Sequence, residues 1–256
     1  MSTANEIYPG FGGVPLALHR VGEGRPVVLL HGLFSSAHMN WIKFGHAEAI
    51  AAQGYEVLMP DLRAHANSAA PHDPAAYPPD VLVRDLAALV AHLGITDYDL
   101  GGFSLGARTV LHAVAKGEAT PKRLIVGGMG VEGLRNWQRR ADHFIALIDR
   151  FEAITRDDPA FLAAQFMKSQ KVDRVATRHL LGSFTDLPHE LLPRVVMPTL
   201  VVCGAEDHDN GSGEELAGAL PDAVFVEVPG GHMSSIAKRE FGRAIAAWLG
   251  PASALA

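Results

Sequence analysis

One serine lies in a sequence pattern that is typical of nucleophilic catalysis. Ser104 stands in the stretch GFSLG, residues 102–106, which fits the pattern G-x-S-x-G. An apolar run at residues 98–102 predicts a strand, and a helical pattern follows directly at residues 105–116. Such a turn strains the backbone at the serine and exposes its hydroxyl beside a helix N-terminus, where the dipole favours developing negative charge. The pattern therefore predicts a serine nucleophile.

A histidine and a carboxylate are the groups that would activate such a serine. His232 is singled out among 13 histidines because it follows the last predicted strand, residues 223–228, through Pro-Gly-Gly. Asp207 follows the apolar run at residues 199–204, and Asp209 lies just beyond it. An imidazole can take the proton of a serine hydroxyl, and a carboxylate holds that imidazole in the required tautomer. The pattern favours a catalytic trio of serine, histidine and aspartate.

Short apolar runs alternate with longer helical patterns along the chain. Runs without polar alternation are typical of strands buried on both faces of a parallel sheet. The predicted strands are residues 16–21, 26–30, 55–59, 98–102, 123–127, 199–204 and 223–228, and the clearest helices are residues 79–93, 105–116 and 236–249. This alternation predicts an α/β fold with a mostly parallel sheet. Residues 22–24, Gly-Glu-Gly, join the first two runs and predict an antiparallel hairpin at the sheet edge.

The alternation stops in one long segment, residues 131–198. It contains no convincing strand pattern, and its helical stretches cover residues 136–154, 159–169, 173–184 and 189–195. We expect this segment to form a helical cap, or lid, over a core built from residues 1–130 and 199–256. Large apolar side chains such as Trp137 and Phe166 are more numerous than one docking face requires, so some should line a cavity above the serine.

Composition excludes several classes of protein. Of the 256 residues, 48% are hydrophobic, and 22 basic against 28 acidic residues leave a net charge of −6. This balance disfavours nucleic acid or an anionic membrane as the partner. The single cysteine, Cys203, rules out an internal disulfide framework. The first residues lack the features of a signal peptide, and no apolar run approaches the roughly 20 residues that span a bilayer. We therefore expect a cytoplasmic protein.

Further motifs give the sequence a family resemblance. They are HGL at residues 31–33, DLRAHANS at 61–68, GAED at 204–207 and GGH at 230–232, each following a predicted strand. Together with GFSLG they resemble the motifs of the α/β-hydrolase family, in particular its serine esterases and cofactor-free haloperoxidases, over residues 14–249. The resemblance implies helices on both faces of the sheet and a small helical cap inserted after the sixth strand of that fold.

The resemblance also assigns catalytic roles. It implies that Ser104 is the nucleophile, His232 the general base and Asp207 the acid, because Asp207 lies at the family's position three residues after a glycine. Asp209 and Glu132 remain alternatives for the acid. Serine at the nucleophile position excludes the relatives that use aspartate there, the epoxide hydrolases and haloalkane dehalogenases.

Two loops carry the remaining implications of the resemblance. The oxyanion hole is expected at the main-chain N–H groups of Leu33 and Leu105, with Phe34 as the second choice for Leu33. The other loop departs from the family at Ala64 and Ala66, where glycine is usual. If both positions require a positive φ, alanine costs about 1 kcal/mol at each.

The expected activity is hydrolysis of a carboxylic ester in a small or medium, fairly apolar molecule, of the carboxylesterase type. The same catalytic side chains could instead carry out perhydrolysis, thioester cleavage, amide cleavage or carbon–carbon hydrolysis. A ligand receptor with slow turnover is an alternative from a different class of protein. No cofactor follows from this chemistry. Residues 207–210, Asp-His-Asp-Asn, supply fewer oxygen ligands than a loop that binds a hard cation requires, so we expect no metal.

Overall fold

The computed structural model describes residues 6–255, and within them one sheet of eight strands forms the centre of the molecule. The strand order is β1-β2-β4-β3-β5-β6-β7-β8. The strands are β1 (Glu6–Pro9), β2 (Pro15–Val21), β3 (Arg25–Leu30), β4 (Tyr55–Pro60), β5 (Asp99–Phe103), β6 (Leu124–Gly127), β7 (Thr199–Gly204) and β8 (Ala223–Val228). Strands β3 to β8 pair in parallel. The prediction of a mostly parallel sheet is confirmed. Residues 1–5 and 256 of the predicted core lie outside the described residues.

The prediction of a hairpin between residues 16–21 and 26–30 is wrong. Strand β4 lies between β2 and β3, pairing antiparallel with β2 and parallel with β3. The turn at Gly22–Gly24 passes close over the start of β4, since a Cβ on Gly24 would lie 2.1 Å from the carbonyl oxygen of Gly54. The turn therefore carries the chain across β4 instead of back along β2. The antiparallel hairpin at this edge is formed by β1 and β2.

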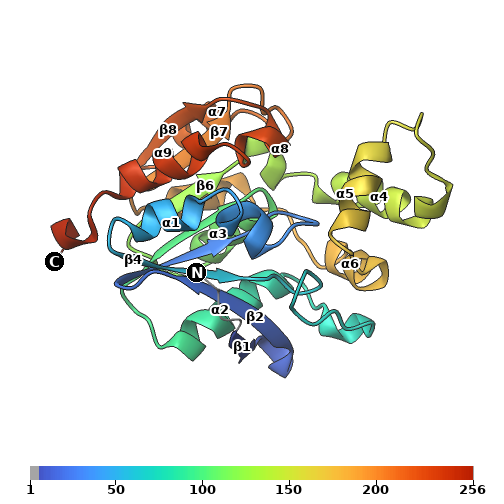
Figure 1. Cartoon of the computed structure of the whole chain (residues 1–256), viewed down its shortest axis with the longest axis horizontal. Helices are drawn as coiled ribbons and strands as arrows, with labels where there is room; N and C mark the ends of the chain where they lie inside the picture. Colours follow the sequence, from blue (N-terminus) through green and yellow to red (C-terminus); the bar gives the residue numbers. More distant parts are fainter. Residues whose placement is uncertain (1–5, 256) are drawn as a thin grey trace.

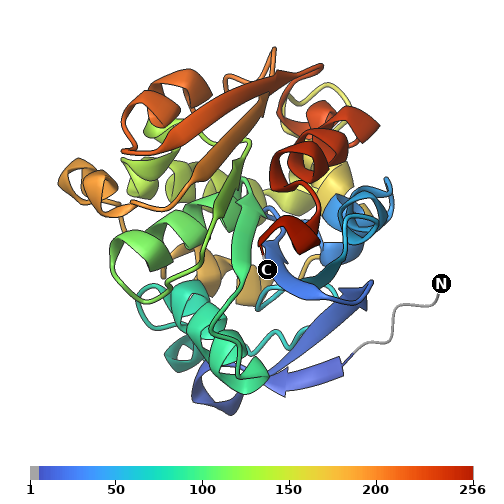
Figure 2. The same ribbon diagram turned by 90° about the vertical axis from the view of Figure 1, so that its left-hand side faces the viewer.

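Helices cover both faces of the sheet, because alternate side chains of each buried strand point to opposite faces. The helices are α1 (His46–Ala51), α2 (Val81–Leu93), α3 (Leu105–Ala115), α4 (Trp137–Asp149), α5 (Phe161–Ser169), α6 (Arg174–Leu181), α7 (Gly213–Gly218), α8 (His232–Ser235) and α9 (Arg239–Leu249). Val28 and Leu30 belong to the core under α2, α3 and α7, whereas Val27 and Leu29 belong to the core under α1 and α9. Figure 2 shows these two groups of helices on opposite sides of the strands.

The chain between β6 and β7 forms α4, α5 and α6, and Figure 1 shows these helices together to one side of the core. The predicted helix at residues 189–195 is a 3-10 helix, His189–Arg194, and shorter turns of this type precede and follow α4 at Val131–Leu134 and Phe151–Ala153. This segment has an apolar cluster of its own, in which Trp137, Ile148 and Met167 pack around Phe34 of the core. The cap boundaries, residues 131–198, stay a prediction. In the described part of the chain, no helix is both long and apolar enough to cross a bilayer.

Candidate active site

Three side chains predicted from the sequence meet beyond the carboxyl ends of the parallel strands. Ser104 follows β5, Asp207 follows β7, and His232 follows β8 and opens α8. Nε2 of His232 lies 2.9 Å from Oγ of Ser104. Nδ1 of the same ring lies 2.9 Å from Oδ2 and 3.1 Å from Oδ1 of Asp207. The three groups thus form one continuous hydrogen-bonded chain.

The hydrogen bonds of His232 define its tautomer. An ionised carboxylate can only accept, so Nδ1 of His232 carries a proton and donates it to Asp207. Nε2 then has a free lone pair and accepts the hydroxyl proton of Ser104. The ring of Phe103 stacks on the imidazole, with ring centres 5.0 Å apart. This arrangement allows the histidine to act as a general base toward the serine.

The turn at Ser104 has the strained backbone that the motif predicts. Ser104 adopts φ 52° and ψ −111° directly before α3. The flanking glycines supply space: a Cβ on Gly102 would lie 2.2 Å from the carbonyl carbon of Gly106, and one on Gly106 would lie 2.3 Å from the carbonyl oxygen of Leu30. Strand, serine and helix can pack this closely only because both glycines lack side chains.

Neither of the two alternative acids contacts the ring of His232 among the described residues. The main-chain N–H of Asp209 donates to Oδ1 of Asp207 at 3.3 Å, so Asp209 supports Asp207 and does not replace it. Glu132 packs against Gly211 and lines a separate cavity. Among the described residues, Asp207 is the acid whose carboxylate contacts the ring of His232.

The loop after β3 presents the main-chain groups that the resemblance assigned to an oxyanion hole. Leu105 is the first residue of α3, where an N–H group has no acceptor within its own helix. The N–H of Gly32 donates to Oδ1 of Asn40 at 2.8 Å, and the N–H of Phe34 donates to Nε2 of His65 at 3.1 Å. Because the N–H of Phe34 is already engaged, Leu33 is the better candidate for the second donor.

Buried neutral histidines hold this loop in place. Nδ1 of His31 donates to the carbonyl of Gly32 at 2.8 Å, and its Nε2 accepts from the N–H of Leu62 at 2.9 Å. Nδ1 of His65 donates to the carbonyl of Arg63 at 2.9 Å. Burial lowers the pKa of His31, and it lowers the pKa of His65 to about 3. Both rings therefore stay uncharged and able to accept main-chain hydrogen bonds at neutral pH.

The same loop region contains an ionised aspartate. Asp61 accepts hydrogen bonds from Nε2 of His19 at 3.0 Å, from the N–H of Ala37 at 2.9 Å and from Nδ2 of Asn67 at 2.9 Å. Burial opposes ionisation of this carboxyl, but the hydrogen bonds outweigh it and lower its pKa to about 2. Asp61 thereby fixes the start of the loop in which Ala64 and Ala66 adopt positive φ of 66° and 46°.

A cavity of about 510 Å³ opens above Ser104 and His232. Apolar residues from both the core and the segment between β6 and β7 line most of it: Phe34, Leu105, Met129, Trp137, Phe144, Leu162, Phe166 and Met233. Its lining also includes four polar residues that sequence analysis missed: Ser35, Asn40, Arg108 and Arg140. The Ser35 hydroxyl is buried and has no hydrogen-bond partner among the described residues.

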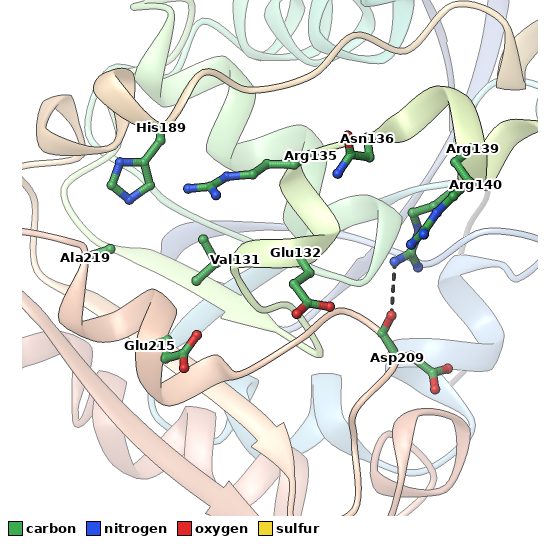
Figure 3. Close-up of a pocket in the computed structure, with 10 residues that line it drawn as sticks. All are labelled: Val131, Glu132, Arg135, Asn136, Arg139, Arg140, His189, Asp209, Glu215 and Ala219. Carbon is green, nitrogen blue, oxygen red and sulfur yellow. Dashed lines mark hydrogen bonds between the residues drawn. The ribbon is translucent and has the colours of Figure 1, made fainter.

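A second cavity, of about 690 Å³, adjoins the first and is mostly polar. Arg140 and Asp209 line both cavities. Figure 3 shows Arg135, Arg139 and Arg140 above Glu132, with Glu215 and Asp209 below it in this view. Among residues 6–255, no group of three or more His, Cys, Asp or Glu side chains is placed to hold a metal ion.

Comparison with known proteins shows similarity to α/β hydrolases. The family model for the alpha/beta hydrolase fold matches residues 25–125. An epoxide hydrolase from Caballeronia sordidicola is 34% identical over 95 residues, which are 37% of this chain and 28% of that protein. N-formylmaleamate deformylase from Pseudomonas putida is 25% identical over 194 residues, 71% of this chain and 70% of that protein. A thermophilic esterase structure from Thermogutta terrifontis, with malate bound, is 26% identical, with a TM-score of 0.73 over 96% of this chain and 98% of that one.

These similarities agree with the sheet order, the turn at Ser104 and the loop after β3. The chain has the α/β-hydrolase fold, and the family model for that fold matches its residues 25–125. Its class of activity is hydrolysis.

Proposed function

We propose that the protein is a serine hydrolase that cleaves carboxylic esters through a covalent acyl-enzyme. The observation that carries the proposal is the ring of His232, which is hydrogen-bonded to Ser104 through Nε2 and to Asp207 through Nδ1. In the first step, Oγ of Ser104 attacks the ester carbonyl carbon while Nε2 of His232 takes the hydroxyl proton. Collapse of the tetrahedral intermediate breaks the bond to the alkoxy oxygen, and His232 returns the proton to the departing alcohol.

Water completes the second half of the reaction. His232 removes a proton from a water molecule, whose oxygen attacks the acyl carbon, and the acid product leaves as Ser104 regains its proton. The Asp207 carboxylate stabilises the imidazolium that forms in each half. The N–H groups of Leu33 and Leu105 accommodate the negative oxygen of each intermediate, and a donor of this kind contributes about 2.7–4 kcal/mol in a measured precedent.

The cavity above Ser104 supports a substrate of moderate size with a fairly apolar body. Its volume of about 510 Å³ lies within the usual range for small-molecule sites, and most of its lining is apolar. The segment between β6 and β7 supplies Trp137, Phe144 and Phe166 to that lining. We therefore propose that residues 131–198 act as a cap that covers the site and determines which acyl and alcohol groups fit.

Labelling with a fluorophosphonate tests the proposed nucleophile. The protein should react at one site, and Ser104→Ala should abolish both labelling and turnover of a chromogenic ester. Labelling that survives in Ser104→Ala would remove the assignment. A Ser36→Ala protein is a suitable control, because Ser36 is buried nearby and its hydroxyl accepts a hydrogen bond from the N–H of Met39.

A further inference from the structure

Arg108 is a buried cation in the wall of the active-site cavity. It lies one helical turn after Ser104 in α3, and its N–H donates to the carbonyl of Ser104 at 2.9 Å. The residue is 3% exposed. Its guanidinium donates to two main-chain carbonyls, those of Gly133 at 3.2 Å and of Thr185, and it packs over the ring of Trp137. These contacts hold it in place without neutralising its charge.

Three other arginines that are buried or partly buried have carboxylate partners. Arg63 is 1% exposed and forms two hydrogen bonds with Asp85, at 2.7 and 2.9 Å. Arg25 and Arg123 both pair with Asp99. In the part of the chain that the structure describes, no carboxylate oxygen lies within 4.0 Å of a guanidinium nitrogen of Arg108. Arg108 therefore differs from these arginines, whose charges are paired with carboxylates within the fold.

The acids nearest to Arg108 are already engaged with other groups. Asp80 accepts from Nζ of Lys116 at 2.5 Å and from Oγ1 of Thr185 at 2.8 Å. Asp186 accepts from the main-chain N–H groups of Asn136 and Trp137, at 3.1 and 2.7 Å, at the start of α4. Neither carboxylate is in contact with the guanidinium of Arg108. Burial lowers the pKa of this guanidinium to about 10. Arg108 remains cationic at neutral pH.

Arg140 adds a second guanidinium to the same cavity. It donates to the main-chain oxygen of Asp209 at 3.0 Å, and Figure 3 shows the Asp209 carboxylate turned away from it. Asp207, which is the other nearby carboxylate, is bound to His232. The cavity thus combines apolar walls with cationic groups that lack close carboxylate partners. A buried ion is costly unless an opposite charge pairs with it, and a ligand anion in the cavity would supply that charge.

We propose that the substrate carries a free carboxylate in addition to the scissile ester, and that Arg108 binds this carboxylate while the apolar walls hold the chain between the two groups. The substrate class is therefore a half-ester of a dicarboxylic acid, or an ester with an equivalent pendant carboxylate. The main chains of Ser104 and Arg108 are separated by one helical turn, about 6 Å along the axis, so a half-ester with a short flexible spacer is the first substrate to test. This inference rests on the ester hydrolysis proposed above.

Matched esters separate this proposal from a merely structural role of Arg108. The p-nitrophenyl half-ester of glutaric acid is compared with the neutral p-nitrophenyl pentanoate, and the measured quantity is the ratio of their kcat/KM values. The wild-type ratio should favour the half-ester. Arg108→Met should lower this ratio about ten- to hundredfold, the range expected for loss of a hydrogen bond to a charged group, and Arg108→Lys should retain part of it. Arg156→Met, at an exposed arginine that lines neither cavity, should leave the ratio unchanged.

A role in holding the cap alone would reduce kcat/KM equally on both esters and leave the ratio constant, which would overturn the proposal. Direct binding provides a test that needs no turnover and no Arg108 variant. By calorimetry, Ser104→Ala protein should bind hexanoate at least about tenfold more tightly than hexanamide. Equal affinities would also overturn the proposal. Tight carboxylate binding by a wild-type protein that hydrolyses neither ester would contradict ester hydrolysis while leaving the carboxylate site in place.

Discussion

The main-chain N–H of Phe34 donates a hydrogen bond to Nε2 of His65, across 3.1 Å. His65 can accept this bond only while Nε2 is unprotonated, because its other ring nitrogen donates to the carbonyl of Arg63. The loop that carries Leu33 therefore depends on an uncharged histidine beneath it. Protonation of that ring would replace an acceptor with a second donor facing the N–H of Phe34.

The stability of the protein should consequently fall in mild acid. Burial lowers the folded-state pKa of His65 to about 3, whereas an unfolded histidine titrates near 6.5. The unfolded chain thus binds the proton first, so the stabilisation is complete above pH of about 6.5 and is lost as pH falls toward about 3, by up to about 1.4 kcal/mol per pH unit for each such histidine. His31, whose pKa burial also lowers, acts in the same direction.

Urea unfolding between pH 7.5 and 4.5 measures this dependence. His65→Gln removes one titrating ring and should make the fall in unfolding free energy shallower, even if its stability at pH 7.5 is lower. His143→Gln changes an exposed histidine of α4 and should leave the slope as in the wild type. A slope that is the same in all three proteins would contradict the role assigned to His65.

Asp207 and Asp209 should respond very differently to the same substitution. Asp207→Asn allows His232 to adopt the wrong tautomer and should lower kcat by about 10⁴, as in the serine-protease precedent. Asp209→Asn keeps the main-chain hydrogen bonds of that residue and should change kcat only a few-fold. Steady-state kinetics on one chromogenic ester compare the two variants. The opposite ranking would assign the acid to Asp209, and two active variants would direct attention to Glu132.

The cavity should select esters by the length of their apolar chain. Across neutral esters from acetate to octanoate, kcat/KM of the wild type should rise with each buried methylene, by about 1–3 kcal/mol in transition-state free energy, until the cavity is full. Phe166 lines the cavity and is partly buried, so Phe166→Ala should move the preferred length upward. Leu162 is 80% exposed at the same cavity, and Leu162→Ala should leave the optimum in place. Preference for acetate in every variant would contradict an apolar cavity.

A gain in stability is expected where alanine occupies a left-handed backbone position. Ala66 is exposed and has φ 46°, so Ala66→Gly should raise the free energy of unfolding by about 1 kcal/mol. Ala64→Gly should gain less, because the Ala64 methyl is buried in the core and its packing would be lost. As a control, Ala88→Gly within α2 should lower stability by about 1 kcal/mol. Thermal and urea unfolding measure whether each substitution raises or lowers the free energy of unfolding.

Local patterns predicted the fold well where strands are buried on both faces. Residues 199–204 coincide with β7, which is buried at every position, because a continuous apolar run bounded by turn residues indicates such a strand. Residues 223–228 coincide with the edge strand β8, whose apolar residues also identified it although only Val228 is fully buried. Strand β1 was missed, since it has four residues and only one of them, Tyr8, is buried. The pairing of β2 was predicted wrongly because the order of strands depends on contacts between distant segments.

The same distinction applies to the candidate site: residues in a local motif could be predicted, and residues placed by contacts between distant segments could not. Ser104, Asp207 and His232 could be predicted because each follows a recognisable strand within a short motif. Arg108 could not be predicted, because the carbonyls of Gly133 and Thr185 that hold its guanidinium come from the folded segment between β6 and β7. The burial of His65 could not be predicted either, because it results from packing beneath the loop after β3, a segment distant in the sequence.

The close packing of Gly102 and Gly106 has a consequence for protein engineering. Because any side chain at either position would collide with main-chain atoms, a library randomised over residues 102–106 and selected for folding alone should return glycine at both ends. That selection would not require serine at position 104, although the positive φ there would still disfavour bulky and β-branched side chains. A screen for catalysts in such a library must therefore monitor turnover directly, because recovery of the two glycines reports a folded scaffold and carries no information about whether it still reacts.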